Sequence, residues 1–173
     1  NKMEDAREIS ALINACSRLG HSNTALSFCL ENKKAIKKAE EIYASYKQEL
    51  ISGLNYAEQN KIEGRNYIIL NAKDKIKDTI IGTIASIISM SSTREKGTIV
   101  VAMAYDRDRI KVSARVVGRN GKNVREILEK TIKVTGGESG GHPLAAGCLI
   151  QKEKEKEFLN ELIKNLELEV IKI

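Results

Sequence analysis

A glycine-rich stretch followed by a histidine carries the clearest potential for chemistry in this sequence. Four glycines fall within the six residues from Gly136 to Gly141, and His142 and Pro143 follow directly. Glycines permit positive φ angles and leave backbone N–H groups uncovered, so a loop of this composition can wrap an anion. An imidazole held by the following proline can donate to the same anion. The stretch predicts a phosphate-binding loop, with a flexible turn between a helix and a strand as the alternative.

A second candidate lies earlier in the chain, in the segment from Lys111 to Arg115. Alternation along a strand places Lys111, Ser113 and Arg115 on one face. A guanidinium fork beside a hydroxyl suits phosphate oxygens, because both groups donate hydrogen bonds. The alternative is the solvated face of an antiparallel sheet. Together with the glycine stretch, this segment favours a phosphate site.

Residues for catalysis are harder to find. Asp106 and Asp108 lie in a predicted hairpin, where Asp favours the turn, and His21 is typical of a loop. Two histidines without an inward-facing carboxylate cluster do not make a two-metal hydrolase site, and nothing resembles a nucleophile elbow. We therefore expect no catalytic residue, metal site or cofactor site in this chain, and no activity from the chain alone.

Composition limits the class of protein and its partners. The 173 residues are 42% hydrophobic and 30% charged, which is enough to build a core, and no apolar run reaches membrane-spanning length. A net charge of +6 is compatible with a nucleic-acid partner. The odd number of cysteines, without zinc-site spacing, indicates reduced thiols. We expect a cytoplasmic protein with no membrane contact.

Hydrophobic periodicity predicts a helical N-terminal part and a mixed α/β domain. The fold class is α/β, with a mixed sheet flanked by helices, preceded by an N-terminal helical segment and a long linker helix. Predicted helices cover residues 4–17, 24–30, 33–60, 78–88, 123–134 and 152–166. Predicted strands cover residues 67–70, 98–104, 110–117, 145–150 and a closing strand near 168–173.

Four segments carry a resemblance to a known family. The stretch from Gly140 to Gly147, which reads Gly-Gly-His-Pro-Leu-Ala-Ala-Gly, resembles the DHH phosphoesterase superfamily. The match is to the DHH-associated C-terminal domain of RecJ-like, archaeal-type exonucleases. Similar stretches are the apolar helix Asp78–Ser86, the strand Val112–Arg115 and the segment Asn14–Gly20. The resemblance covers nearly the whole chain.

The resemblance implies a piece of a two-lobed protein. In the family, the N-terminal lobe carries an Asp-His-His motif and further aspartates that hold two Mn²⁺ or Mg²⁺ ions. This chain begins with Asn1 and has none of those ligands. We expect residues 1–32 to be the end of the catalytic lobe, 33–63 a linker helix and 64–173 the DHH-associated substrate-binding domain. Mn²⁺ or Mg²⁺ is expected in the full-length parent only.

The resemblance also assigns roles to residues. Gly140, Gly141 and His142 would reach the substrate phosphate near the metals, and Ser113 with Arg115 would hold the backbone of the strand. Glu138-Ser139 is a departure, because the family often runs glycines together here.

The implied function is the nucleic-acid- and phosphate-binding part of a metal-dependent 5′–3′ single-strand exonuclease in DNA repair. Alternatives are part of an oligoribonucleotide or cyclic-dinucleotide phosphodiesterase, or a non-catalytic scaffold in an archaeal replication complex. The expected partners are therefore single-stranded nucleic acid, an oligonucleotide phosphate, or replication and repair proteins.

Without the catalytic lobe, the first helices would expose an apolar stripe. This stripe comprises Ile9, Leu12, Ile13 and Cys16, continued by Ile42, Tyr46, Leu50 and Leu54. Soluble monomers rarely expose so much apolar surface. Either these helices fold back onto the sheet domain or they pair with a second copy, and we expect the homodimer.

Overall fold

A computed structural model describes residues 5–91, 94–118 and 122–171. The chain divides into two compact units, Asn1–Ser52 and Gly53–Ile173. Within the described ranges, no helix is both long enough and apolar enough to cross a bilayer.

The first unit is helical and has its own core. It contains α1 (Ala6–Arg18), α2 (Ser22–Cys29) and the first part of α3 (Lys33–Asn60). Asp5 caps α1, because its side chain accepts a hydrogen bond from the backbone N–H of Arg7 at 2.8 Å. One cluster of buried side chains joins the three helices: Leu12, Cys16, Ala25, Phe28, Ala35, Ala39 and Ile42.

This cluster corrects one prediction about the N-terminal stripe. Leu12, Cys16 and Ile42 are buried, and Ile9 and Ile13 pack against the same cluster. The expectation of an uncovered stripe on the first helix was wrong, because α2 and the start of α3 cover it. The homodimer loses this support and stays a prediction. The division into 1–32, 33–63 and 64–173 also stays a prediction.

The second unit is built on a six-stranded sheet with the order β1-β2-β3-β4-β6-β5. Strands β2 and β3 are parallel, and every other neighbouring pair is antiparallel. The strands are β1 (Ile62–Gly64), β2 (Tyr67–Asn71), β3 (Ile99–Asp106), β4 (Arg109–Val116), β5 (Glu138–His142) and β6 (Ala145–Gln151). This confirms the predicted mixed α/β fold with a preceding helical segment.

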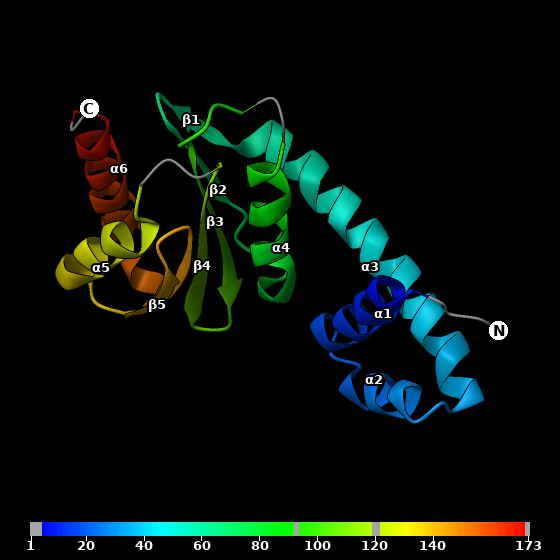
Figure 1. The fold of residues 1–173 in the computed structure, drawn as a ribbon. Helices are drawn as coiled ribbons and strands as arrows, with labels where there is room; N and C mark the ends of the chain where they lie inside the picture. The colour runs from blue at the N-terminus through cyan, green and yellow to red at the C-terminus, as the bar shows by residue number, and fades with distance from the viewer. Residues whose placement is uncertain (1–4, 92–93, 119–121, 172–173) are drawn as a thin grey trace. The chain divides into compact units, whose positions relative to one another are not determined.

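Helices cover both faces of the sheet (Figure 1). Helix α4 (Asp78–Ser89) connects the parallel strands β2 and β3 and packs on β3 and β4. On the opposite face lie α5 (Val124–Thr135) and α6 (Glu155–Ile171), the latter after a short 3₁₀ helix (Lys152–Lys154). The core between the sheet and these two helices includes Val112, Cys148, Leu128, Phe158 and Leu162, among others.

Two local predictions were wrong, and one short strand was missed. The predicted glycine loop is largely the edge strand β5, because Glu138–His142 pairs in register with β6. The predicted closing strand is part of α6, which runs on to Ile171; residues 172 and 173 lie outside the described residues. The short strand β1 was not predicted at all.

Candidate functional site

Two of the predicted phosphate ligands lie in one row across three strands. Arg115 of β4 pairs with Ala145 of β6, which in turn pairs with His142 of β5. Directly opposed residues of an antiparallel sheet project from the same face. Neighbouring strands are about 4.8 Å apart, so the Cα atoms of Arg115 and His142 are about 10 Å apart, with only a methyl group between them.

The next row creates a hollow. Ser113 pairs with Gly147, which pairs with Gly140. A Cβ atom at Gly140 would meet no other atom within 4 Å, so this glycine faces open space. The result is an open hollow of about 430 Å³, in which Lys111, Ser113 and Arg115 line the β4 side. Residues of the β5–β6 hairpin and Asp106, the last residue of β3, line the rest of it.

Two further glycines allow the strands to approach closely. A Cβ atom at Gly147 would lie 2.8 Å from the carbonyl oxygen of Val112. Gly141 has a φ of +129°, and its Cβ atom would lie 2.6 Å from the carbonyl oxygen of Ala145. Gly141 pairs with Ala146, which puts it in the alternate row and on the opposite face. Its backbone borders the hollow, but its orientation differs from that of the other four predicted site residues.

The guanidinium of Arg115 is held in place by protein groups. Its Nε donates to Ser86 Oγ at 3.1 Å, and its Nη1 donates to the carbonyl oxygens of Ala114 at 2.8 Å and Ala146 at 3.4 Å. A planar fork fixed in this way loses less freedom when it binds an anion. Arg115 is therefore oriented before any ligand arrives.

Helix α4 reaches the polar face of β4 through a glycine. A Cβ atom at Gly82 would lie 3.1 Å from Ser113 Oγ and 3.8 Å from Arg115 Nη2. Ser113 is only 8% exposed under this helix. Gly82 and Ser86 are spaced i, i+4, so both small residues face the same strand. This small-residue spacing in an apolar helix is the signal that could have identified Ser86, which was not predicted as a site residue.

The charges around the hollow are mixed, because the carboxylate residue Asp106 lines it together with the cations Lys111 and Arg115. Lys111 Nζ lies 3.6 Å from an oxygen of Asp78, the first residue of α4, so this lysine is partly neutralised. Glu138 lies at the far end of β5, about 13 Å along the strand from His142. The departure from the family pattern at Glu138 thus puts its carboxylate well away from the Arg115–His142 row.

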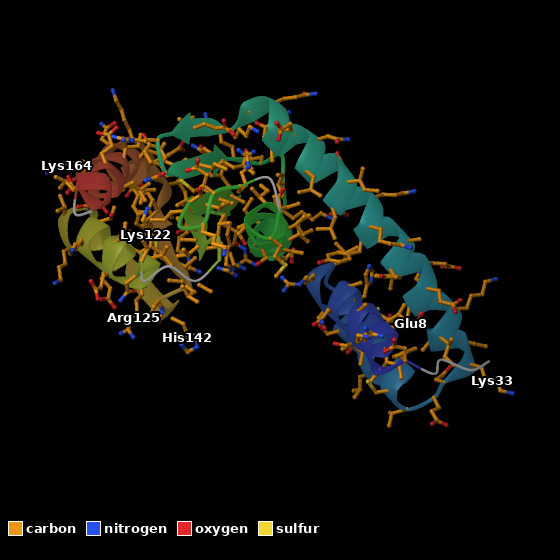
Figure 2. All side chains as sticks on the ribbon, turned by 45° about the horizontal axis from the view of Figure 1, so that its top comes forward. Glu8, Lys33, Lys122, Arg125, His142 and Lys164 are labelled. Carbon is orange, nitrogen blue, oxygen red and sulfur yellow. The ribbon has the colours of Figure 1, made fainter. Side chains whose placement is uncertain are left out.

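His142 ends the edge strand and is exposed. Its side chain points away from the ribbon (Figure 2). The turn after it is anchored at two points: the carbonyl of Pro143 accepts from the N–H of Val124 at 2.8 Å, and the carbonyl of Leu144 accepts from the N–H of Val116 at 3.0 Å. The backbone of His142 is therefore fixed while its imidazole faces solvent.

A metal centre is not formed by the residues that the structure describes. Among them, no group of three or more His, Cys, Asp or Glu side chains is arranged to hold an ion. The Mn²⁺ or Mg²⁺ implied by the family resemblance therefore does not fit the donor set of this part of the chain, and no metal-dependent step is assigned to its residues.

Comparison with known protein families shows to which family this chain belongs. Residues 64–168, more than half of the chain, match the family described as the DHHA1 domain. The chain belongs to this family. The DHHA1 match contains all five predicted phosphate ligands, from Ser113 to His142.

Several known proteins similar to this DHHA1 chain are much longer than it is. An uncharacterised protein of Methanocaldococcus jannaschii is 31% identical over 166 residues, which cover 94% of this chain and 35% of that protein. RecJ from Thermus thermophilus, solved in complex with Mg²⁺, has a TM-score of 0.72 and 21% identity, covering 89% of this chain and 24% of the RecJ chain. The pGpG-specific phosphodiesterase PggH of Vibrio has a TM-score of 0.54 and 16% identity, covering 75% of this chain and 42% of PggH. The two solved structures share the fold.

Proposed function

We propose that this DHHA1 domain binds the phosphodiester backbone of single-stranded nucleic acid. It would do so as the substrate-binding part of a RecJ-like, metal-dependent exonuclease. The observation that carries the proposal is the fixed guanidinium of Arg115, held by Ser86 Oγ and two carbonyl oxygens in one row with His142. A guanidinium held in this orientation presents its positive charge at a fixed position, which suits an anionic phosphate oxygen.

The composition of the hollow favours the backbone over the bases. None of the residues that line it is aromatic, and aromatic residues make up only 4% of the chain. Proteins that grip single strands through their bases use aromatic stacking platforms. Glycine backbone and cationic side chains instead suit sugar and phosphate.

The catalytic part of this proposal belongs to a longer protein. The chain spans about a third of the archaeal relative and about a quarter of the RecJ chain. The metal ions of a parent nuclease would be held by residues outside the described part of this chain. Roles in DNA repair, a cytoplasmic location and contacts with replication proteins are parts of the same proposal.

A short oligonucleotide or cyclic dinucleotide is a second candidate ligand. The PggH neighbour is a pGpG-specific phosphodiesterase. The first hollow, with a volume of about 430 Å³, is small, which suits a short ligand. Affinity that keeps rising with strand length supports the exonuclease interpretation. Affinity that levels off at two nucleotides supports the second candidate, and no binding at all supports a scaffold.

Replacement of Arg115 tests the proposal. Binding of fluorescent single strands is measured by anisotropy over a series of salt concentrations. One lost phosphate contact should lower the slope of log affinity against log salt by about 0.7. Arg115→Ala should weaken binding to all sequences about equally, because phosphate contacts carry no base information.

Two further variants keep the test specific. Arg115→Lys retains the charge but loses the fork, so we expect it to recover only part of the affinity. Lys164→Ala removes a cation on α6, on the opposite side of the sheet, and should leave binding unchanged. Parent-like binding by Arg115→Ala and His142→Ala across the whole salt series would contradict the proposed site.

A further inference from the structure

A second hollow lies beside the first and shares residues with it. It has a volume of about 580 Å³ and is lined from the C-terminal end of α4, the segment before β3 and the end of β4. Arg115 and Ala145 line both hollows. The guanidinium assigned to a phosphate therefore stands at the border between two adjoining spaces.

The second hollow is more cationic than the first. Arg94, Lys96 and Arg115 line it, together with Ser86, Ser89 and Ser91, and its described lining includes no carboxylate. Two carboxylates adjoin these cations: Glu95, which is exposed, lies between Arg94 and Lys96 in the sequence, and Glu63 accepts from Arg94 Nη1 at 2.9 Å. Glu63 also pairs with Lys61 Nζ at 3.0 Å, and Lys61 pairs in turn with Glu58. The net charge around this hollow favours an anion.

The rim of this hollow is built from fixed backbone. The N–H of Gly97 donates to the carbonyl of Val117 at 2.7 Å, and the N–H of Val117 donates to the carbonyl of Thr98 at 2.9 Å. A Cβ atom at Gly118, where φ is +71°, would lie 3.1 Å from Lys96 Cγ. The stem of Lys96 therefore runs along glycine backbone, and its ammonium group stays at the exposed rim.

An apolar side chain stands at the mouth of the hollow. Met90, the residue that directly follows α4, is 81% exposed and is one of the lining residues. A thioether is polarisable and makes favourable contacts with aromatic rings. Neither hollow has an aromatic lining residue in the described chain, so Met90 is well suited to take a base there.

We propose that this hollow, bounded by Met90, Arg94 and Lys96, binds the nucleotide next to the one whose phosphate lies at Arg115. Lys96 and Arg94 would hold its phosphate and Met90 would contact its base. This inference rests on the proposed function, because it extends the same strand across Arg115. It gives the domain a footprint of at least two consecutive nucleotides, one for each hollow.

Ligand length separates this second subsite from the first. Binding of thymidine monophosphate and of thymidylate oligomers of two, four and eight nucleotides to the whole chain is measured by competition against a fluorescent strand. Met90→Ala should weaken the oligomers by about three- to tenfold. Lys96→Ala should weaken them and lower the salt slope by about 0.7. Either variant should weaken the monophosphate less than the oligomers, because only an oligomer fills both hollows, whereas Arg115→Ala should weaken every ligand.

The outcomes distinguish the two proposals. If Arg115→Ala weakens all ligands but Met90→Ala and Lys96→Ala bind the oligomers like the parent chain, the second subsite is refuted and the proposed function stands. Equal losses for the monophosphate and the oligomers in Met90→Ala or Lys96→Ala would also refute it. If Arg115→Ala has no effect on any ligand, the proposed function itself fails. Lys164→Ala serves as the charge control, and equal thermal midpoints exclude loss of fold as the cause.

Discussion

Filling the first hollow at Gly140 should weaken binding strongly without harming the fold. The position is suited to this test because a Cβ atom there meets nothing within 4 Å and its φ is not positive. In Gly140→Val, two methyl groups would occupy the space between the β5 backbone and Arg115. A bound nucleic-acid strand could then not form its charge-assisted hydrogen bond with the guanidinium. Such a contact contributes about 1.5–3 kcal/mol, so the expected loss of affinity is about 10- to 150-fold.

The same change should not lower stability. Glycine is unfavourable in a strand and valine is favourable, on a scale that spans about 1 kcal/mol. The free energy of unfolding from urea titration should therefore stay the same or rise by up to about 1 kcal/mol. Glu138→Val is the matched control, because it puts the same side chain on the same strand about 7 Å away. It also removes a negative charge, so it should not weaken binding. Parent-like affinity in Gly140→Val would refute the first hollow as the binding surface.

Two further predictions concern the strands beside the first hollow. Gly147→Ala should lower the free energy of unfolding by about 1–3 kcal/mol, because its Cβ atom would lie 2.8 Å from the Val112 carbonyl oxygen. The measurement is a urea titration, and an unchanged unfolding midpoint would show that β4 and β6 move apart at this point without cost. Burial raises the pKa of the Cys148 thiol from 9.0 to about 12. The folded state then keeps a proton that the unfolded state loses, so stability is fully present below pH 9 and declines towards pH 12 by up to about 1.4 kcal/mol per pH unit. Cys148→Ala should flatten this decline, and equal slopes in both proteins would contradict the assignment.

The sequence predicted the charged part of the site better than its shape. The alternation from Lys111 to Arg115 is a property of any half-covered strand, and the structure shows it: Val112 and Ala114 lie in the core while Ser113 and Arg115 line the groove. Glycines have no strand preference of their own, so β5 could not be recognised from Glu138–His142. Its strand geometry comes from pairing with β6.

Other features depend on contacts between distant segments. Phe28 and Ile42 pack against the apolar face of α1. Neither periodicity nor composition predicts which helix these two side chains contact. Beyond Leu166 the sequence is apolar at both helical and strand spacing, and the structure continues α6 there to Ile171. Met90 and Lys96 approach Arg115 only because β3 and β4 are neighbours, so they carried no signal as site residues.

In the first hollow, the positive charge and the open space come from different strands. The cation lies on β4, inside the sheet, where two neighbouring strands and α4 fix its position. The space lies on the outer hairpin of β5 and β6, where it exists because Gly140 has no side chain. Changes in the hairpin can therefore deepen or narrow the first hollow while Arg115, the proposed anion-binding residue, stays where it is. One architecture can in this way serve phosphate-bearing ligands of different bulk, with selectivity adjusted at the rim of the sheet and affinity retained at its centre.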